Sequence, residues 1–462
     1  MRPVAHPVPL GWKAECIETL RLAGPLAAAN LLQMLTYAVD VIFIARLGAQ
    51  ELAASSLAIA IFAIMLSAIN GLMSAVSPMA AAELGARAPA LRPIRRTLRM
   101  SLWIAVGLAL LGILLCVQAE TIMLAAGQDP EISVLADDYL IILMWSLLPL
   151  SLSVPLRNFV STLGRPFFAT AITGLSVVVN TIANYAFIFG NLGAPAMGLE
   201  GAAVATVISN TAVLVAYVVA IRMDPRLHRY HIFGYFWRPD WQRFFEVLRI
   251  GTPIAFTVMA EGGVFGAAAF LMGLFGAEQL AAHTLAIQLA ALAFMIPAGV
   301  GQAATIRVGY FFGAQEPEGI RQAGWSALAI GVAFMSLSAT ILLLAPELLF
   351  RIYLDPEDPA NTAVIGFALS YVVVCAAFQL FDGLQVVGVG VLRGLKDTRM
   401  PMWIAIFSYW VPGFGLAVGL GFFTPLADVG IWVGLAAGLI SAASLLVWRW
   451  HRREALGLTN VT

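Results

Sequence analysis

Long apolar stretches dominate the chain, and each is about as long as a helix that crosses a lipid bilayer. A helix rises about 1.5 Å per residue, so roughly 20 apolar residues cross a hydrocarbon core of about 30 Å. Short polar segments separate the stretches and carry most of the charged residues. The pattern predicts twelve transmembrane helices, over residues 24–45, 53–80, 98–118, 133–155, 167–190, 200–221, 251–273, 280–305, 323–345, 363–390, 401–422 and 429–448.

Composition agrees with this pattern. The chain has 462 residues, of which 61% are hydrophobic and 11% are charged, whereas about a quarter of the residues in a soluble domain are charged. We therefore expect an all-α integral membrane protein. The first 23 residues include Lys13, Glu15 and Glu18 and lack an apolar core, so we expect no cleavable signal peptide.

The basic residues predict the orientation. If the chain crosses twelve times, all but two of the 26 Lys and Arg residues lie on the side that carries both termini, the exceptions being Arg46 and Arg351. Because cytoplasmic loops are enriched in Lys and Arg, both termini are expected in the cytoplasm. The net charge of zero says little about partners. Because the basic residues are topology signals, no nucleic-acid partner is expected.

The chain contains an internal duplication. "LGAQELAASSLAIA" begins at residue 47 and "FGAEQLAAHTLAIQ" at residue 275, an offset of 228 that also relates "LRLAGPLAAAN" to "LRIGTPIAFTV". Each copy holds six predicted helices, so the copies insert the same way up, as in the parallel repeats of some secondary transporters. The predicted parts are a cytoplasmic N-terminal segment, an N-lobe, a cytoplasmic linker, a C-lobe and a cytoplasmic tail, at residues 1–23, 24–221, 222–249, 250–448 and 449–462.

Three acidic residues lie well inside predicted spans, namely Asp40, Glu261 and Asp382. A charge at that depth costs at least about 2.5 kcal/mol, so each carboxyl needs a partner, a proton, a cation or a water-filled cavity. Glu261 and Asp382 are predicted at one depth in one lobe, where they could share a proton or cation. The alternative is a buried structural carboxyl held by hydrogen bonds.

Asp40 has amide side chains as candidate neighbours. Asn180 and Asn184 lie one helical turn apart in "VVNTIANYAF", and oxygen-rich groups around a carboxylate suit a proton relay or a small hard cation. At the offset of 228, Asp40 aligns with Ala268 and Glu261 with Gln33. Each lobe is therefore expected to hold its own acidic site, and we expect no Arg or Lys among these carboxyls.

Aromatic, methionine and glutamine side chains near the carboxyls are candidates for a cavity that accepts flat hydrophobic cations. Packing and lipid contact are the alternative roles. The candidates are Gln33, Met34, Tyr37, Met65, Met73, Phe256, Met259, Phe265, Phe294, Gln379 and Gln385.

Motifs of nucleotide-driven pumps and of common hydrolases are missing. The only lysines are Lys13 and Lys396, and neither lies in a phosphate-binding G-x-x-x-x-G-K-[ST] loop. "LKDTR" is not the motif of a phosphorylated ion pump, and no HExxH or nucleophile elbow occurs. We expect no enzyme and no cofactor, and an ion gradient or a partner as the energy source.

Several stretches together resemble one transporter family. They are "PLAAANLLQMLTYAVD", "NTIANYAFIFGNLGAPAMGLEGAAVAT", "GTPIAFTVMAEGG", "LAAHTLAIQLAALAFMIPAGVGQAATIRVG" and "VLRGLKDTRMP". From about residue 20 to 450 the chain resembles the multidrug and toxic compound extrusion (MATE) family, in its NorM-type branch. The resemblance implies two six-helix lobes arranged as a V, which export mostly cationic amphipathic compounds in exchange for Na⁺ or H⁺.

The resemblance also implies roles for the acidic residues. Asp40, Asn180 and Asn184 match an N-lobe ion or proton site of the family, and Glu261 and Asp382 match the C-lobe acidic pair of the NorM-type branch. Either site could hold Na⁺.

One position departs from the family. Phe378, one turn before Asp382, stands where some Na⁺-coupled members have a tyrosine. The choice between H⁺ and Na⁺ therefore stays open.

The sequence thus favours a secondary multidrug antiporter in a bacterial inner (plasma) membrane, working as a monomer on small cationic drugs amid membrane lipids. A lipid-linked oligosaccharide flippase is one alternative, although it should hold its pyrophosphate with clustered basic residues. A membrane receptor or structural protein without transport is another. Substrate range and stoichiometry are left open.

Overall fold

The computed structural model describes residues 11–351, 353–354 and 358–460, and this part of the chain is helical. Twelve helices in the described residues are long and apolar enough to cross a membrane, which confirms the predicted number. The elements are α1 (Trp12–Ala45), α2 (Ala49–Met73), α3 (Val76–Arg87), α4 (Leu91–Cys116), α5 (Ala119–Ala125), α6 (Pro130–Leu143), η1 (Met144–Ser146), α7 (Leu147–Thr162), α8 (Pro166–Phe189), α9 (Gly198–Met223), α10 (Pro225–His228), α11 (Trp241–Gly273), α12 (Ala277–Gly313), α13 (Pro317–Leu344), α14 (Pro346–Phe350), η2 (Pro359–Asn361), α15 (Thr362–Gly394), α16 (Arg399–Ser408), η3 (Tyr409–Phe414), α17 (Gly415–Phe423) and α18 (Ala427–His451).

Several helices are longer than the apolar stretches that predicted them. α1 begins at Trp12 instead of residue 24, and α11 begins at Trp241 instead of residue 251. α12 continues to Gly313, beyond the predicted end at residue 305. Hydropathy detects only the part of a helix that needs an apolar solvent, whereas these helices continue through charged turns that ion pairs hold in place.

The chain divides into two compact units. Unit 1 comprises residues 1–27, 84–88 and 256–462, and unit 2 comprises residues 28–83 and 89–255. α1 therefore passes from unit 1 to unit 2 after Ala27, and α11 passes from unit 2 to unit 1 after Ala255. These two alanines are 228 residues apart, which is the offset of the duplication. The lobe boundaries drawn from the sequence stay a prediction.

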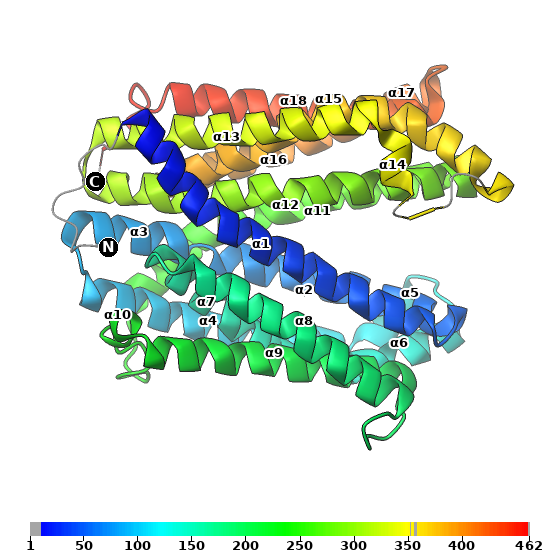
Figure 1. The fold of residues 1–462 in the computed structure, drawn as a ribbon, viewed down its shortest axis with the longest axis horizontal. Helices are drawn as coiled ribbons and strands as arrows, with labels where there is room; N and C mark the ends of the chain where they lie inside the picture. The colour runs from blue at the N-terminus through cyan, green and yellow to red at the C-terminus, as the bar shows by residue number, and fades with distance from the viewer. Residues whose placement is uncertain (1–10, 352, 355–357, 461–462) are drawn as a thin grey trace. The chain divides into compact units, whose positions relative to one another are not determined.

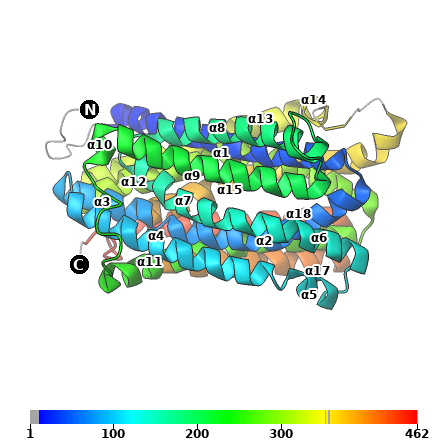
Figure 2. The same cartoon turned by 90° about the horizontal axis from the view of Figure 1, so that it is seen from below.

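Each unit has its own apolar core. In unit 2, α7, α8 and α9 pack side by side, and in unit 1, α12, α13, α15 and α18 do so (Figures 1 and 2). Alanines and large aliphatic side chains fill both cores. The small residues allow close helix contact, as is common where lipid replaces water as the solvent.

Two glycines bring helices into contact at equivalent places of the repeat. A Cβ on Gly71 of α2 would lie 2.4 Å from Cα of Ala255 in α11, within unit 2. A Cβ on Gly299 of α12 would lie 2.6 Å from the backbone nitrogen of Ala27 in α1, within unit 1. Gly71 and Gly299 are also 228 residues apart. The duplication therefore preserved a backbone-to-backbone contact that only glycine permits.

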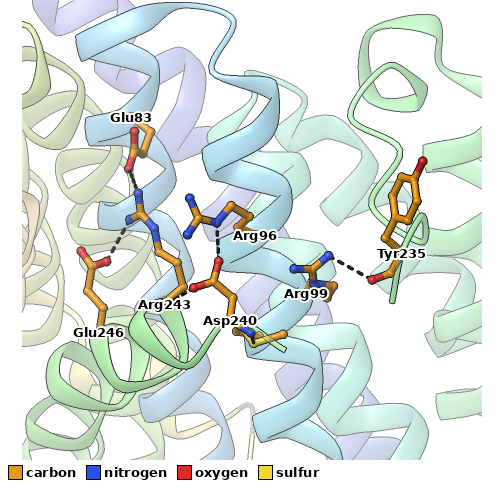
Figure 3. A network of polar contacts seen from close by, with 8 residues as sticks. Glu83, Arg96, Arg99, Tyr235, Asp240, Arg243 and Glu246 are labelled. Atoms are coloured by element: carbon orange, nitrogen blue, oxygen red, sulfur yellow. Dashed lines mark hydrogen bonds and ion pairs between the residues drawn. The ribbon is translucent and has the colours of Figure 1, made fainter. Parts of the chain in front are cut away.

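Ion pairs anchor the first turns of α1 and α11. In unit 1, Arg307 donates to the buried carboxylate of Glu15 from Nε at 2.8 Å and Nη2 at 2.5 Å. In unit 2, Arg243 donates to Glu83 at 2.6 Å and to Glu246 at 2.9 Å (Figure 3). Glu15 and Arg243 are equivalent at the offset of 228. The repeat thus kept an ion pair at this place while the charge on the first turn was reversed.

The segment before α11 lies against α4. Arg99 donates to the carbonyl oxygen of Tyr235 at 3.0 Å, and Trp103 Nε1 donates to the carbonyl oxygen of Phe236 at 3.1 Å. Arg96 donates to the carboxylate of Asp240, immediately before α11 (Figure 3). These contacts fix where α11 starts.

Candidate ion and substrate sites

A carboxylate and two amides meet in unit 2. Asp40 of α1 is 8% exposed, and Asn180 and Asn184 of α8 are fully buried. Nδ2 of Asn184 donates to Asp40 Oδ1 at 2.6 Å and to Asn180 Oδ1 at 3.1 Å. Residues four apart lie on one face of a helix, so Asn184 can contact both the carboxylate of Asp40 and the amide oxygen of Asn180. The structure therefore brings these three predicted residues together.

Oxygen atoms predominate in this cluster. Asn184 donates its amide nitrogen, and its Oδ1 is left without a hydrogen-bond partner. Tyr139 of α6 lies within electrostatic reach of Asp40. Carboxylate, amide and hydroxyl oxygens are the ligands that hard cations prefer, and a carboxyl in such a site can instead hold a proton.

A second cluster forms in unit 1. Asp382 is 5% exposed on α15, with Gln379 and Gln385 buried on the same helix. Glu261 of α11 interacts electrostatically with Asp382 and accepts a hydrogen bond from Gln385. The two carboxyls predicted to lie at one depth are thus neighbours.

Unpartnered oxygen atoms line this second cluster. Gln379 Oε1, Asp382 Oδ1, Gln385 Oε1 and the Tyr409 hydroxyl are buried without a hydrogen-bond partner. Buried polar atoms are nearly always paired, so four together indicate a place for a cation, a proton or water. Predicting this site from the sequence missed Tyr409, which begins the π-helical turn η3. The available signal was Pro412 inside an apolar span, because proline disrupts regular α-helical hydrogen bonds.

Neither cluster has the composition of a transition-metal site. Among the residues that the structure describes, no three His, Cys, Asp or Glu side chains gather where they could hold a metal ion. The Na⁺ sites expected from the sequence combine one or two carboxylates with amides. They stay a prediction.

The candidate cavity residues differ in exposure. Tyr37, Phe256 and Met259 are exposed by 45%, 50% and 38%. Met73 is fully buried in the core of unit 2, so its side chain contacts only protein. Gln379 and Gln385 belong to the acidic cluster of unit 1. Five other candidates are partly exposed, namely Gln33, Met34, Met65, Phe265 and Phe294.

The expectation that no arginine lies among the carboxyls was wrong. α7 and α15 continue past the predicted ends at residues 155 and 390 and include Arg157 and Arg393. Arg157 donates to Gln33 Oε1 at 3.3 Å in unit 2, and Arg393 interacts with Glu261 in unit 1. The duplication could have pointed to both arginines, because "LRNFVSTLGRP" at 156 parallels "LRGLKDTRMP" at 392 and the second residue of each stretch is an arginine.

Solved structures of known transporters have this fold. One is a transporter of the MOP superfamily from Pyrococcus furiosus, with a TM-score of 0.86, 20% sequence identity and coverage of 97% of either chain. Another is an outward-facing multidrug resistance MATE family transporter, with a TM-score of 0.84, 20% identity and coverage of 96% of this chain and 97% of that one.

Sequence relatives are closer. The probable multidrug resistance protein NorM of Mesorhizobium japonicum is 44% identical over 445 residues, covering 96% of this chain and 95% of that protein. The protein of the same description in Brucella suis is 41% identical over 444 residues, covering 96% and 94%. The MatE family model matches twice, at residues 25–186 and 253–418, and the two matches start 228 residues apart. The chain therefore belongs to the MATE family, in its NorM-type branch.

Proposed function

We propose that this protein is a secondary active multidrug efflux antiporter that exports cationic amphipathic compounds in exchange for H⁺ or Na⁺. The observation that carries the proposal is a buried carboxylate cluster in each unit, with unpartnered oxygen atoms beside it. The relatives are named as multidrug resistance proteins, which supports the export of small molecules by this chain. We therefore propose a transporter and not an enzyme. The twelve candidate spans support a multi-pass membrane protein.

The finer assignments follow the charge distribution. We place the protein in a bacterial inner membrane with both termini in the cytoplasm, because nearly all Lys and Arg residues fall on that side of the spans. We propose a monomer surrounded by lipid. Small organic cations are the substrates that buried carboxylates and exposed aromatics such as Tyr37 would attract.

Exchange requires that ion and drug compete through the carboxylates. On the outer side, a proton or Na⁺ neutralises Asp40 or the pair of Glu261 and Asp382 and weakens the binding of a cationic drug. On the inner side, the ion leaves, and the free carboxylate charge favours drug binding. Such a cycle works only if ion and drug differ in affinity for the two states of the transporter.

Proteoliposomes loaded with a fluorescent cation test this proposal. Efflux is measured under a proton gradient alone and under a sodium gradient alone, for the wild type and for Asp40→Asn, Glu261→Gln and Asp382→Asn. Each variant keeps hydrogen-bonding capacity and loses the charge, so gradient-driven efflux should fall at least about tenfold, equivalent to about 1.4 kcal/mol. If the efflux rate of the wild type were the same with and without each gradient, antiport would be refuted.

Further variants make the test specific. If Glu261 and Asp382 act as one site, the double variant should resemble the worse single variant. Glu278→Gln is the matched control, because it makes the same change at an exposed position in the first turn of α12. A similar loss in this control would show that the assay reports general damage.

A further inference from the structure

The linker segment of residues 235–238 presents aromatic side chains on the outside of unit 2. Trp237 is 84% exposed and Tyr235 is 65% exposed. Two arginines lie over the ring of Tyr235, Arg238 at 4.8 Å and Arg95 of α4 at 5.9 Å from its centroid. Tyr235 also has a φ of +55°, a left-handed conformation that is unfavourable for residues other than glycine and is found mainly at functional places. Neighbouring exposed apolar side chains indicate contact with a partner or a membrane.

The 235–238 segment lies where α4 enters its apolar part. Arg99 and Trp103 of α4 donate to two backbone carbonyl oxygens of the segment, at 3.0 and 3.1 Å, and the apolar stretch predicted for α4 begins at residue 98. Leu110 and Leu114 lie on the same face of α4 as Arg99 and Trp103, and both are exposed. This face therefore leads from the segment to apolar side chains that lipid can cover. The aromatic side chains of the segment are thus at the level of the lipid headgroups, where Tyr and Trp are favoured.

Positive charge gathers beside these aromatic side chains. The arginine cluster consists of four residues within electrostatic reach of one of them, namely Arg95, Arg96, Arg99 and Arg238. In the part of the chain that the structure describes, Arg96 alone of the four forms an ion pair, with Asp240 (Figure 3). Arg99 is 7% exposed, and its Nε has no hydrogen-bond partner. The cluster therefore includes a buried guanidinium that is not fully satisfied.

Two further carboxylates beside the cluster are already paired. Glu83 and Glu246 both accept hydrogen bonds from Arg243 (Figure 3). These groups together comprise five arginines and three carboxylates, which is an excess of two positive charges. Holding such an excess partly away from water costs free energy, most of all for the buried Arg99. An anion from outside the chain would offset that cost.

The repeat shows that the fold does not require the arginine cluster. At the offset of 228, the three arginines of the cluster on α4 align with small residues of α13, namely Ala323, Gly324 and Ala327. Unit 1 therefore builds the equivalent helix without basic residues at these places. A topology signal requires only positive charge in a cytoplasmic loop. It does not require arginines that lie over an exposed aromatic ring.

We infer that the 235–238 segment and the start of α4 form a binding surface for the headgroups of anionic phospholipids. Arg95 is partly exposed and Arg238 is exposed, and guanidinium groups bind phosphate oxygens through paired, charge-assisted hydrogen bonds. Trp237 lies at the boundary between headgroups and acyl chains. The lipid supplies the negative charge that the arginine cluster lacks and holds the linker against the membrane. This surface does not depend on the proposed export function.

Lipid binding to the purified protein tests the surface. Native mass spectrometry in detergent measures dissociation constants for phosphatidylglycerol and phosphatidylcholine with the same acyl chains. The wild type should bind the anionic lipid more tightly. Arg95→Gln combined with Arg238→Gln should lower that preference by about tenfold or more, equivalent to about 1.4 kcal/mol, because each basic residue near an anionic headgroup adds to the attraction. A double variant with the wild-type preference would overturn the inference.

Companion variants separate this surface from positive charge in general. Arg95→Lys combined with Arg238→Lys should keep most of the preference, because the charges stay in place. Arg399→Gln combined with Arg452→Gln removes two exposed arginines from helix ends of unit 1 and should leave the preference unchanged. An equal loss in this control would show that the lipid responds to the total charge of the protein, and the inference would fail.

Tryptophan fluorescence tests the location of the segment independently of the arginines. The emission that disappears in Trp237→Phe reports on this side chain. In vesicles, phospholipids brominated near the headgroup end of the acyl chain should quench that emission more than iodide in the water does. The reverse order would place Trp237 in water, assign the surface to a soluble acidic partner and overturn the inference.

Free phosphate shares the chemistry of the lipid headgroup, so it is added as a competitor. Inorganic phosphate at the concentration of the lipid should leave the dissociation constant for phosphatidylglycerol unchanged, because it lacks the acyl chains that the aromatic side chains contact. Displacement of the lipid by inorganic phosphate would indicate a site for a soluble anion and overturn the inference.

Discussion

Asp240 lies at the end of the segment that precedes α11, and a hydrogen bond from Arg96 is the strongest influence on its carboxylate. The hydrogen bond from Arg96 lowers the pKa of the Asp240 carboxyl below its ordinary value of 3.8. A group with a lowered pKa in the folded state stabilises the fold above its unfolded pKa, and this contribution is lost as the pH falls through the folded value. The stabilisation should therefore be present at neutral pH and disappear below about pH 4.

Asp240→Asn tests this dependence. The variant should be less stable than the wild type at neutral pH by about 1 kcal/mol, because Arg96 is partly exposed and its contribution is screened by solvent. Thermal unfolding in detergent should show the difference shrinking as the solution is acidified from neutrality to below pH 4. Asp138→Asn, at an exposed position of α6, is the control. A constant difference at every pH would contradict the role of the carboxylate charge.

Single residues also show which parts of the candidate sites can be predicted from the sequence. Asp40, Asn180 and Asn184 could be grouped from the sequence because a charge inside an apolar span is costly and amides four residues apart share a face. Tyr409 and Arg157 could not, because a tyrosine in an apolar span looks like packing and an arginine near a span end looks like a topology signal. Their significance depends on which atoms remain unpartnered after folding.

At the scale of helices, the paired glycine contacts are the most sensitive points. A methyl group at Gly71 or Gly299 would meet backbone atoms of α11 or α1 that cannot rotate away. Gly71→Ala and Gly299→Ala should each therefore destabilise the protein by about 1–3 kcal/mol through overpacking. Thermal unfolding of the purified variants measures this loss.

Gly107→Ala in α4 is the matched control, since a Cβ there meets nothing within 4 Å. It should be neutral or stabilise the protein by up to about 1 kcal/mol, because alanine favours helix more than glycine does. If all three substitutions had the same effect, helix propensity would explain the result and the close contacts would not matter.

Helix number could be predicted from the sequence, and helix ends could not. Apolar length counts crossings well because every crossing must satisfy its backbone within the bilayer. The charged first turns of α1 and α11 lie outside that constraint, and their helical state depends on partners such as Arg307 and Glu83. Those partners lie far away in the sequence, so local propensity does not identify them.

At the scale of the whole molecule, the two sequence repeats and the two structural units do not coincide. Residues 12–27 belong to unit 1 and residues 241–255 to unit 2, so each repeat supplies part of a long helix to the other unit. A chain cut between α10 and α11 should therefore function only when both pieces are made together. A single affinity tag on residues 1–234 should retain the piece 235–462.

The separate pieces provide the comparison. Each alone should be degraded or aggregate, because it lacks the helix segment with which its unit makes a close glycine contact and an ion pair. Size-exclusion chromatography of the tagged piece, with and without the other, would reveal this dependence. Two pieces that are each stable and monodisperse alone would contradict it.

The exchange of helix segments also sets an order for biosynthesis. All of unit 2 has been translated once the ribosome passes Ala255, so this unit can finish folding while the rest of the chain is still being made. Unit 1 receives its first segment at the very start of translation, yet Gly299 and Arg307, which contact that segment, are made much later. Glu15 therefore lacks its partner Arg307 until most of the chain has been made. The oldest part of the nascent protein is among the last to reach its final place.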